Sequence, residues 1–88
     1  MEIEFLEKFN RDLDRLVDVS TKRAVRKTIF SIQHADTLRE IPNIKKLRGF
    51  KSAYRIRIGD YRIGIFVEGD VVQFARIVHR KDIYKVFP

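Results

Sequence analysis

The sequence contains no cysteine, no tryptophan, only two prolines and no long run of apolar residues. Without cysteine, neither a disulfide framework nor a cysteine-ligated zinc site can supplement the core. No segment approaches the roughly 20 apolar residues that a membrane-spanning helix needs. The first ten residues are acidic and amphipathic, which is unlike a secretory signal. The sequence therefore predicts a cytoplasmic protein without a membrane segment.

Chemical motifs are also scarce. The only histidines, His34 and His79, do not have a metal-binding spacing. The chain has no phosphate-binding P-loop, no glycine-rich dinucleotide loop and no nucleophile elbow. We therefore expect no metal and no cofactor. A length of 88 residues with 44% hydrophobic content predicts one domain that spans residues 1–88.

Positive charge is concentrated in the second half of the chain. Residues 1–43 carry eight Lys or Arg and eight Asp or Glu, whereas residues 44–88 carry eleven and four. The formal net charge of +7 therefore arises after residue 43. Because this excess falls on predicted strands and not on an amphipathic helix, it favours a nucleic-acid partner over a membrane surface.

The pattern of apolar residues predicts an α+β fold. A strand near residues 3–6 precedes a hairpin of two amphipathic helices, the first within residues 5–17 and the second from an N-cap at Ser20 to about residue 36. Residues 38–51 are expected to form an irregular basic connection. Alternation then predicts an antiparallel meander of strands at 53–58, 61–67 and 71–79, followed by a short C-terminal helix or docked tail.

The strand period places arginines together on one face of this sheet. Arg55 and Arg57 share a face with Arg62 and Gly64 of the next strand, while the helical hairpin covers the other, apolar face. We expect the arginine face to stay open, with Gly64 leaving room for the backbone of a ligand. Polar solvent faces are common in antiparallel sheets, but three arginines without an acidic neighbour repel one another unless an anion bridges them. The pattern therefore predicts a phosphate or nucleic-acid site.

Other cationic residues extend this prediction. The basic connection supplies four candidate phosphate-binding residues: Lys45, Lys46, Arg48 and Lys51. At the end of the last strand, His79 stands beside Arg80, which puts a titratable group next to a fixed cation. A lone histidine is more often structural, and we interpret His34 in that way, as a residue at the C-terminus of a helix.

Three segments together resemble the RelE/ParE superfamily of toxins from type II toxin–antitoxin modules. They are the loop KKLRGF at 45–50, the strand pair YRIRIGDYRIGIFV at 54–67 and the ending HRKDIYKVF at 79–87. The resemblance spans nearly the whole chain and implies the RelE-like fold. It also implies the activity of the RelE branch, which comprises metal-independent, ribosome-dependent endoribonucleases. These enzymes cut mRNA in the ribosomal A site through attack of a ribose 2′-OH on the adjacent phosphate, and so inhibit translation.

The resemblance assigns roles to several residues of this sequence. Arg62 and Arg80 would stabilise or protonate at the phosphate, and Tyr84 would stack on or orient a base. Arg55 and Arg57 match strand positions at which the best-known members carry lysines, one of them the proposed general base. Arginine stays charged at ordinary pH and is a poor base. Either His79 supplies the base, or catalysis relies on positioning and charge through Arg57 and the other cations.

Two alternatives and a partner complete the expectations. The ParE branch shares the fold but inhibits DNA gyrase, and a non-catalytic antitoxin-binding module is a third possibility. The resemblance implies an acidic antitoxin that wraps a toxin of net charge +7. Operator DNA is then contacted only through the antitoxin. The isolated toxin is expected to be monomeric.

Overall fold

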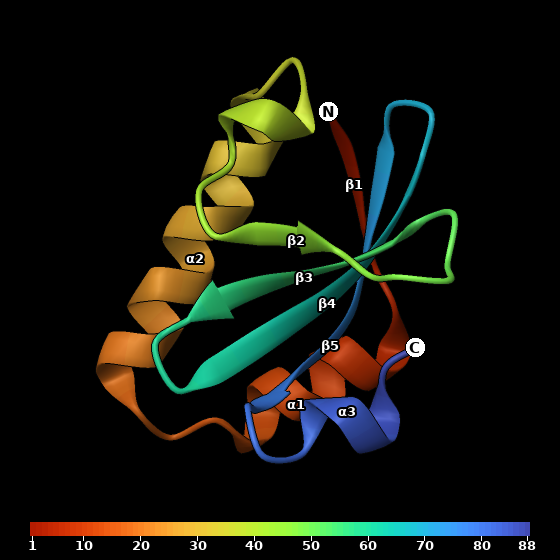
Figure 1. Cartoon of the computed structure of the whole chain (residues 1–88). Coiled ribbons are helices and arrows are strands. Elements are labelled where there is room, and N and C mark those ends of the chain that lie inside the picture. Colours follow the sequence, from red (N-terminus) through yellow and green to blue (C-terminus); the bar gives the residue numbers. More distant parts are fainter.

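Five strands form one sheet in the order β1, β5, β4, β3, β2 (Figure 1). The computed structural model describes all 88 residues. The strands are β1 (Glu2–Phe5), β2 (Ile44–Lys46), β3 (Ala53–Ile58), β4 (Tyr61–Glu68) and β5 (Val71–His79). β1 runs parallel to β5, and the other three pairs are antiparallel. The predicted meander is thus the centre of a wider sheet.

Three α-helices and one short 3-10 helix accompany the sheet. They are α1 (Glu7–Arg15), α2 (Val19–His34), the 3-10 helix η1 (Leu38–Glu40) and α3 (Ile83–Val86). In Figure 1, α2 runs along one side of the sheet, while α1 and α3 lie near each other at its lower end. None of the helices has the length and apolar character needed to cross a membrane.

α2 begins two residues earlier than the sequence predicted. Its N-cap is Asp18, whose carboxylate accepts hydrogen bonds from the backbone N–H of Ser20 at 3.3 Å and from the Thr21 hydroxyl at 2.6 Å. The prediction of Ser20 as the N-cap was therefore wrong. The hydrogen bond from Thr21 is the main reason that the pKa of Asp18 lies below its usual value.

The main core lies between α2 and the sheet. Val25 and Ile32 of α2 are buried against β3, β4 and β5, which contribute Ile56, Ile63 and Phe74. A smaller cluster lies on the opposite face of the sheet, and its buried members are Leu47, Ala53, Ala75, Ile83 and Phe87. The C-terminal segment therefore partly covers the face that carries the arginines. The expectation that this face stays open was wrong for that part of the sheet.

The α+β fold expected from the sequence is confirmed, with two differences in detail. The predicted irregular connection contains η1 and the three-residue strand β2, which pairs with β3 through Ile44 opposite Ile56. In addition, the two long helices do not pack along each other: α1 lies against β5, and α2 lies against β1 and β3.

A buried ion pair joins α1 to β5. Asp12 accepts hydrogen bonds from Arg76 Nε at 2.7 Å and Nη2 at 3.1 Å, and from the backbone N–H of Ile77 at 3.1 Å. The Asp12 side chain is only 6% exposed. The hydrogen bond to Asp12 raises the pKa of the Arg76 guanidinium, which keeps Arg76 charged. Because removing one partner of such a pair leaves the other charge uncompensated, this contact fixes α1 to the sheet.

Candidate functional site

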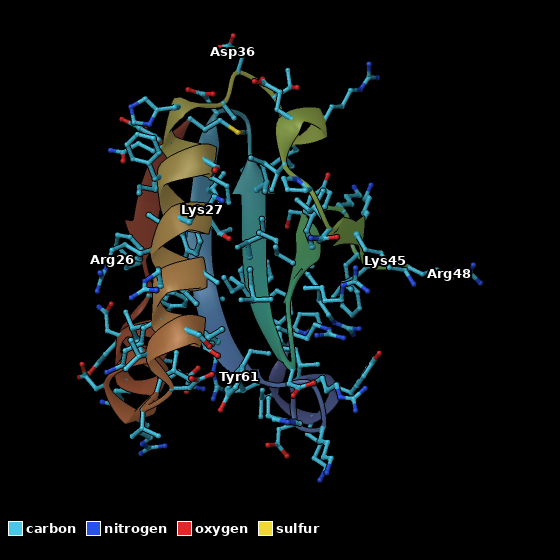
Figure 2. All side chains as sticks on the ribbon, turned by 90° about the vertical axis from the view of Figure 1, so that its left-hand side faces the viewer. Arg26, Lys27, Asp36, Lys45, Arg48 and Tyr61 are labelled. Carbon is cyan, nitrogen blue, oxygen red and sulfur yellow. The ribbon has the colours of Figure 1, made fainter.

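Cationic side chains from three adjacent strands line a shallow depression, which we call the arginine depression. In the strand register Arg57 stands opposite Arg62, and Arg55 stands opposite Lys45. The depression has a volume of about 330 Å³ and is lined by Asn43, Ile44, Lys45, Arg55, Arg57, Arg62 and Tyr84. It lies on the face of the sheet away from α2, and Figure 2 shows Lys45 extending on that side. No carboxylate lines it, so its charge is not neutralised from within.

Neutral oxygen atoms hold two of these arginines in place. Arg62 Nη1 donates to the carbonyl oxygens of Gly59 at 2.8 Å and Tyr61 at 2.9 Å. Arg57 Nη2 donates to Asn43 Oδ1 at 3.2 Å. These bonds orient the guanidinium groups without cancelling their charge. The arrangement therefore provides positioned cations for an anion such as a phosphate group.

Arg55 is positioned by an aromatic ring. Its guanidinium carbon lies 4.2 Å from the centre of the Tyr84 ring, in a cation–π contact. Its Nε atom is buried and has no hydrogen-bond partner, which leaves one donor unsatisfied. The rest of Tyr84 is open to solvent, since the residue is 73% exposed. Tyr84 therefore retains a free surface on which a base could stack.

The C-terminal segment sets the position of Tyr84. Ile83 and Phe87, on either side of it, are buried in the small cluster against Leu47 and Ala53. The Phe87 ring occupies the space above Gly64, where a Cβ atom would lie 2.5 Å from Phe87 Cγ. The expectation that Gly64 leaves room for the backbone of a ligand was therefore wrong, because Gly64 leaves room for Phe87.

Arg80 and His79 lie on different sides of the strand end. The backbone N–H of Arg80 donates to Asp60 O at 2.7 Å, and Arg80 Nε is 3.8 Å from Asp60 Oδ1. This places Arg80 at the same Gly59-Asp60 turn to which Arg62 is bonded. His79 is instead the cross-strand neighbour of Tyr61, and the two rings meet edge to face at 5.5 Å.

Tyr61 packs against the core on the α2 side of the sheet. His79, the cross-strand neighbour of Tyr61, faces the same side of the sheet. It lines a cavity together with Asp12, Arg15 and Asp82. His79 Nδ1 accepts a hydrogen bond from the backbone N–H of Lys81 at 3.2 Å. The structure therefore does not bring His79 into the arginine depression.

The four basic residues of the connection lie in three places, and only one of them lines the arginine depression. Lys45 lines the arginine depression. Lys46 stands opposite Tyr54 in the β2–β3 pair, while Arg48 and Lys51 belong to the exposed loop between these strands. Figure 2 shows Arg48 extending away from α2, beyond Lys45.

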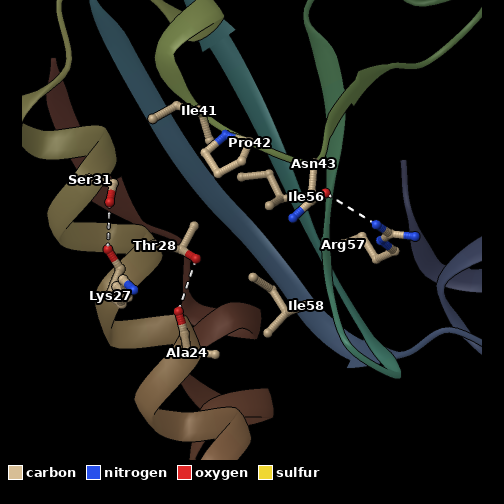
Figure 3. A pocket seen from close by; sticks show the side chains of 10 residues that line it. All are labelled: Ala24, Lys27, Thr28, Ser31, Ile41, Pro42, Asn43, Ile56, Arg57 and Ile58. Carbon is tan, nitrogen blue, oxygen red and sulfur yellow. Dashed lines mark hydrogen bonds between the residues drawn. The ribbon is translucent and has the colours of Figure 1, made fainter.

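A second cavity adjoins the depression and shares Asn43 and Arg57 with it. Figure 3 shows this cavity between α2 and β3, with the Arg57 to Asn43 hydrogen bond at its border. Its volume is about 220 Å³. Isoleucine side chains from η1's end and from β3 form its apolar wall, and Lys27 contributes a cation from α2. The apolar wall of this cavity suits an apolar side chain, and the cations Lys27 and Arg57 suit a negatively charged group next to that side chain on the same ligand.

The exposed side of α2 is a second basic surface. α2 carries Lys22, Arg23, Arg26 and Lys27 and has no acidic residue. Arg26 points outward from the helix in Figure 2, and both Arg26 and Lys27 are exposed. The comparison of the two halves of the sequence concealed this surface, because acidic residues of β1 and α1 offset its charge in the count. The surface lies across the sheet from the arginine depression.

Comparison with known proteins identifies the family. The family model described as "ParE toxin of type II toxin-antitoxin system, parDE" matches residues 3–84. Toxin RelE3 from Methanocaldococcus jannaschii is 40% identical over 89 residues, which cover all of both chains. The chain belongs to the RelE/ParE superfamily of toxins.

Solved structures agree with this assignment. The RelB-RelE antitoxin–toxin complex from Methanococcus jannaschii contains a chain 39% identical to this toxin, with a TM-score of 0.82 over 96% of this chain and 98% of that one. The archaeal RelE-RelB complex from Pyrococcus horikoshii OT3 gives a TM-score of 0.73 at 22% identity, over 90% and 93% of the chains. The second likeness supports the RelE-like fold alone.

Sequence reasoning missed two features of this toxin's site. Asn43 positions Arg57, and its backbone is in the left-handed region with φ of 63°. The signal was available, since asparagine tolerates that conformation and follows a proline here. Asp12 was also missed, although a carboxylate between Phe9 and Leu16 on the apolar side of a helix predicts a buried cationic partner.

We predict that Gly64→Ala destabilises the toxin through Phe87 alone. The new Cβ would overlap the Phe87 ring, so we expect a loss of about 1–3 kcal/mol in the free energy of unfolding. In a Phe87→Ala background the same substitution should be nearly neutral, because the ring is gone. Urea denaturation of the four proteins in the double-mutant cycle measures this coupling. An equal cost of Gly64→Ala in both backgrounds would contradict the contact.

Proposed function

We propose that this toxin is a metal-independent endoribonuclease that cleaves mRNA in the ribosomal A site by attack of a ribose 2′-OH on the adjacent phosphate. The observation that carries the proposal is the arginine depression, where positioned cations and an exposed tyrosine converge without a carboxylate. Cleavage of this kind requires positive charge around a phosphate whose negative charge increases in the transition state. It also benefits from a surface that fixes the neighbouring base.

Each side chain then has a role that follows from its position. Arg62 and Arg80, gathered at the Gly59-Asp60 turn, stabilise the phosphate and the departing 5′-oxygen. Arg57, on the neighbouring strand β3 and opposite Arg62, binds a second oxygen of the same phosphate. Arg55 and Tyr84 act as one unit, in which the guanidinium supports the ring and the ring's free side stacks on a base.

The sequence leaves two answers open to the question of the general base: His79 is the base, or catalysis relies on positioning and charge. The geometry favours the second. His79 lies on the α2 side of the sheet, away from the phosphate-binding arginines. Among the side chains that line the depression, only Lys45 and Tyr84 can exchange a proton, because arginine stays protonated. We propose that positioning and charge supply most of the rate, and that Lys45 in its deprotonated form is the proton acceptor.

An acidic antitoxin is the proposed protein partner. The relatives of known structure include complexes named RelB-RelE from Methanococcus jannaschii and Pyrococcus horikoshii OT3. A segment with carboxylates would match the uncompensated charge of the arginine depression. An apolar side chain of the same segment could enter the adjoining cavity beside Arg57. Operator DNA would then be contacted through the antitoxin and not by this chain.

Gyrase inhibition is the second candidate function, because the matching family model is described as a ParE toxin. A protein that acts only by contact with gyrase has no need of three positioned arginines and a tyrosine in one depression. We therefore place it second. A supercoiling assay with purified gyrase distinguishes it from the nuclease, and a chain inactive in both assays would be a non-catalytic antitoxin-binding module.

We predict that the toxin cleaves mRNA on stalled ribosomes at the A site and that Arg62→Ala and Arg80→Ala each reduce the rate about 100-fold or more, since each removes a charge that stabilises the transition state. Primer extension maps the cut. Arg26→Ala, which removes a cation of α2 on the other side of the sheet, is the matched control and should retain most activity. Failure of folded wild-type protein to cut on ribosomes, or an equal effect of all three substitutions, would refute this assignment.

The pH dependence of cleavage separates the two candidate bases. We expect His79→Ala to keep the shape of the wild-type pH–rate profile, because His79 faces the other side of the sheet and does not line the arginine depression. Lys45→Arg keeps the charge but cannot accept a proton, so it should lower the cleavage rate much more than the affinity for RNA. Loss in His79→Ala of a limb near pH about 6.5, the ordinary histidine pKa, would instead identify His79 as the base.

We also predict that the antitoxin shields the Arg62 and Arg80 region. In the complex, reaction of these arginines with phenylglyoxal should slow markedly, whereas Arg26 on α2 should react as in the free toxin. Mass spectrometry of the modified peptides gives both rates in one sample. Unchanged reactivity of Arg62 and Arg80 in a stable complex would show that inhibition does not cover the site.

A further inference from the structure

An exposed phenylalanine stands at the end of the basic loop between β2 and β3. Phe50 is 50% exposed and belongs to neither hydrophobic cluster. Single exposed apolar residues are common on protein surfaces, so exposure alone carries no function. The surroundings of Phe50 distinguish it from such residues.

The other strongly exposed aromatic residues have a partner within the protein. Phe5 stacks on Phe9, Phe30 stacks on His34 at 4.2 Å, and Tyr84 covers Arg55. Phe50 has neither an aromatic partner nor a cation over its ring. Both faces of its ring are therefore free of such contacts.

The loop around Phe50 is strongly cationic. No acidic residue occurs between Glu40 and Asp60, and this loop and its flanking strands carry Lys45, Lys46, Arg48, Lys51, Arg55 and Arg57. An unpartnered aromatic ring within a cationic segment is the combination that single-stranded nucleic acids require, since the cations follow the phosphates and the ring stacks on a base. An acidic protein segment would match these cations as well, and separate measurements of RNA affinity and antitoxin affinity distinguish it from a nucleobase.

The backbone holds the loop in a defined shape. Leu47 is buried at its start, and the Leu47 N–H donates to Ala53 O at 2.9 Å. The N–H of Val67 donates to Ser52 O at 2.8 Å, and that of Phe50 donates to Leu47 O at 3.4 Å. Because both ends of the loop are attached to the sheet, the ring is presented with little loss of conformational entropy on binding.

We propose that Phe50 is a base-stacking subsite for an unpaired RNA nucleobase, separate from the Tyr84 subsite. Lys45 connects the two places, since it lines the arginine depression and leads along the chain into the loop that carries Phe50. The inference deepens the proposed nuclease function and rests on it for the identity of the ligand. It adds a second stacked base, outside the depression in which the phosphate is cut.

The absence of tryptophan from the chain makes a direct test possible. Phe50→Trp introduces the only tryptophan of the chain at the subsite, so its emission can be followed separately from that of the three tyrosines. We expect its emission to be quenched by a short single-stranded oligoribonucleotide, and to change little with polyphosphate, which has charge but no bases, or with duplex RNA, whose bases are already stacked.

Phe30→Trp is the matched control, because Phe30 is also exposed, at 62%, and lies on the basic surface of α2. Its emission should not respond to the oligonucleotide. Equal quenching at both positions, quenching by polyphosphate, or no quenching at Phe50→Trp under conditions where a labelled oligonucleotide binds would each overturn the proposal.

Affinity provides the second measurement. Phe50→Leu keeps an apolar side chain but removes the ring, so it should weaken oligoribonucleotide binding about tenfold while leaving the slope of log K against log salt unchanged. Phe30→Leu should bind as the wild type does. A Phe50→Leu protein that binds RNA normally but loses antitoxin affinity would overturn the proposal and identify Phe50 as a protein contact.

The stacked base could belong to mRNA or to ribosomal RNA. Quenching of Phe50→Trp on ribosomes that requires mRNA in the A site assigns the base to mRNA, and quenching on empty ribosomes assigns it to ribosomal RNA. Either result supports stacking. Because the oligonucleotide assays need neither ribosome nor cleavage, they fail or succeed independently of the nuclease. A-site cleavage without stacking at Phe50 refutes this inference alone, and stacking without cleavage refutes only the nuclease.

Discussion

The contact between Phe87 and Gly64 determines whether the candidate site exists at all. Gly64 is the position on the arginine-bearing face of β4 where the absence of a side chain admits an aromatic ring. With the ring in place, Ile83 and Phe87 are buried on the sheet, and Tyr84 between them is held above Arg55. A packing contact between apolar groups thus fixes the geometry of a polar site, as expected where a functional side chain is supported by its neighbours.

The charges of the molecule are treated in two opposite ways. Asp12 and Arg76 are paired and largely buried, and their bonds hold α1 to β5. In the arginine depression, Arg57 and Arg62 stand opposite each other on the adjacent strands β3 and β4. Their guanidinium groups are held only by neutral oxygen atoms. Like charges in that position are destabilising. The fold tolerates this repulsion because the side chains remain partly hydrated, and an incoming phosphate would remove it.

Much of this arrangement could be predicted from the sequence, because the period of a strand is reliable. Alternation placed Arg55, Arg57 and Arg62 on one face, and the structure brings them together. The errors came from contacts between segments distant in the chain. Nothing local shows that Phe87 lies over Gly64, and β2 is too short and too basic to be recognised before it is paired with β3. His79 was placed near the arginines by its neighbour Arg80, although successive residues of a strand point to opposite faces.

The same uncompensated charge accounts for both proposed partners of the toxin. If carboxylates of the chain itself neutralised Arg57 and Arg62, RNA would bind weakly, and an acidic antitoxin would have no reason to cover the site. Leaving the depression without an internal anion makes phosphate and carboxylate competitors for the same guanidinium groups. Under this proposal, inhibition by the antitoxin requires no transmitted conformational change. It follows from occupancy, and its strength should depend on salt in the same direction as RNA binding does.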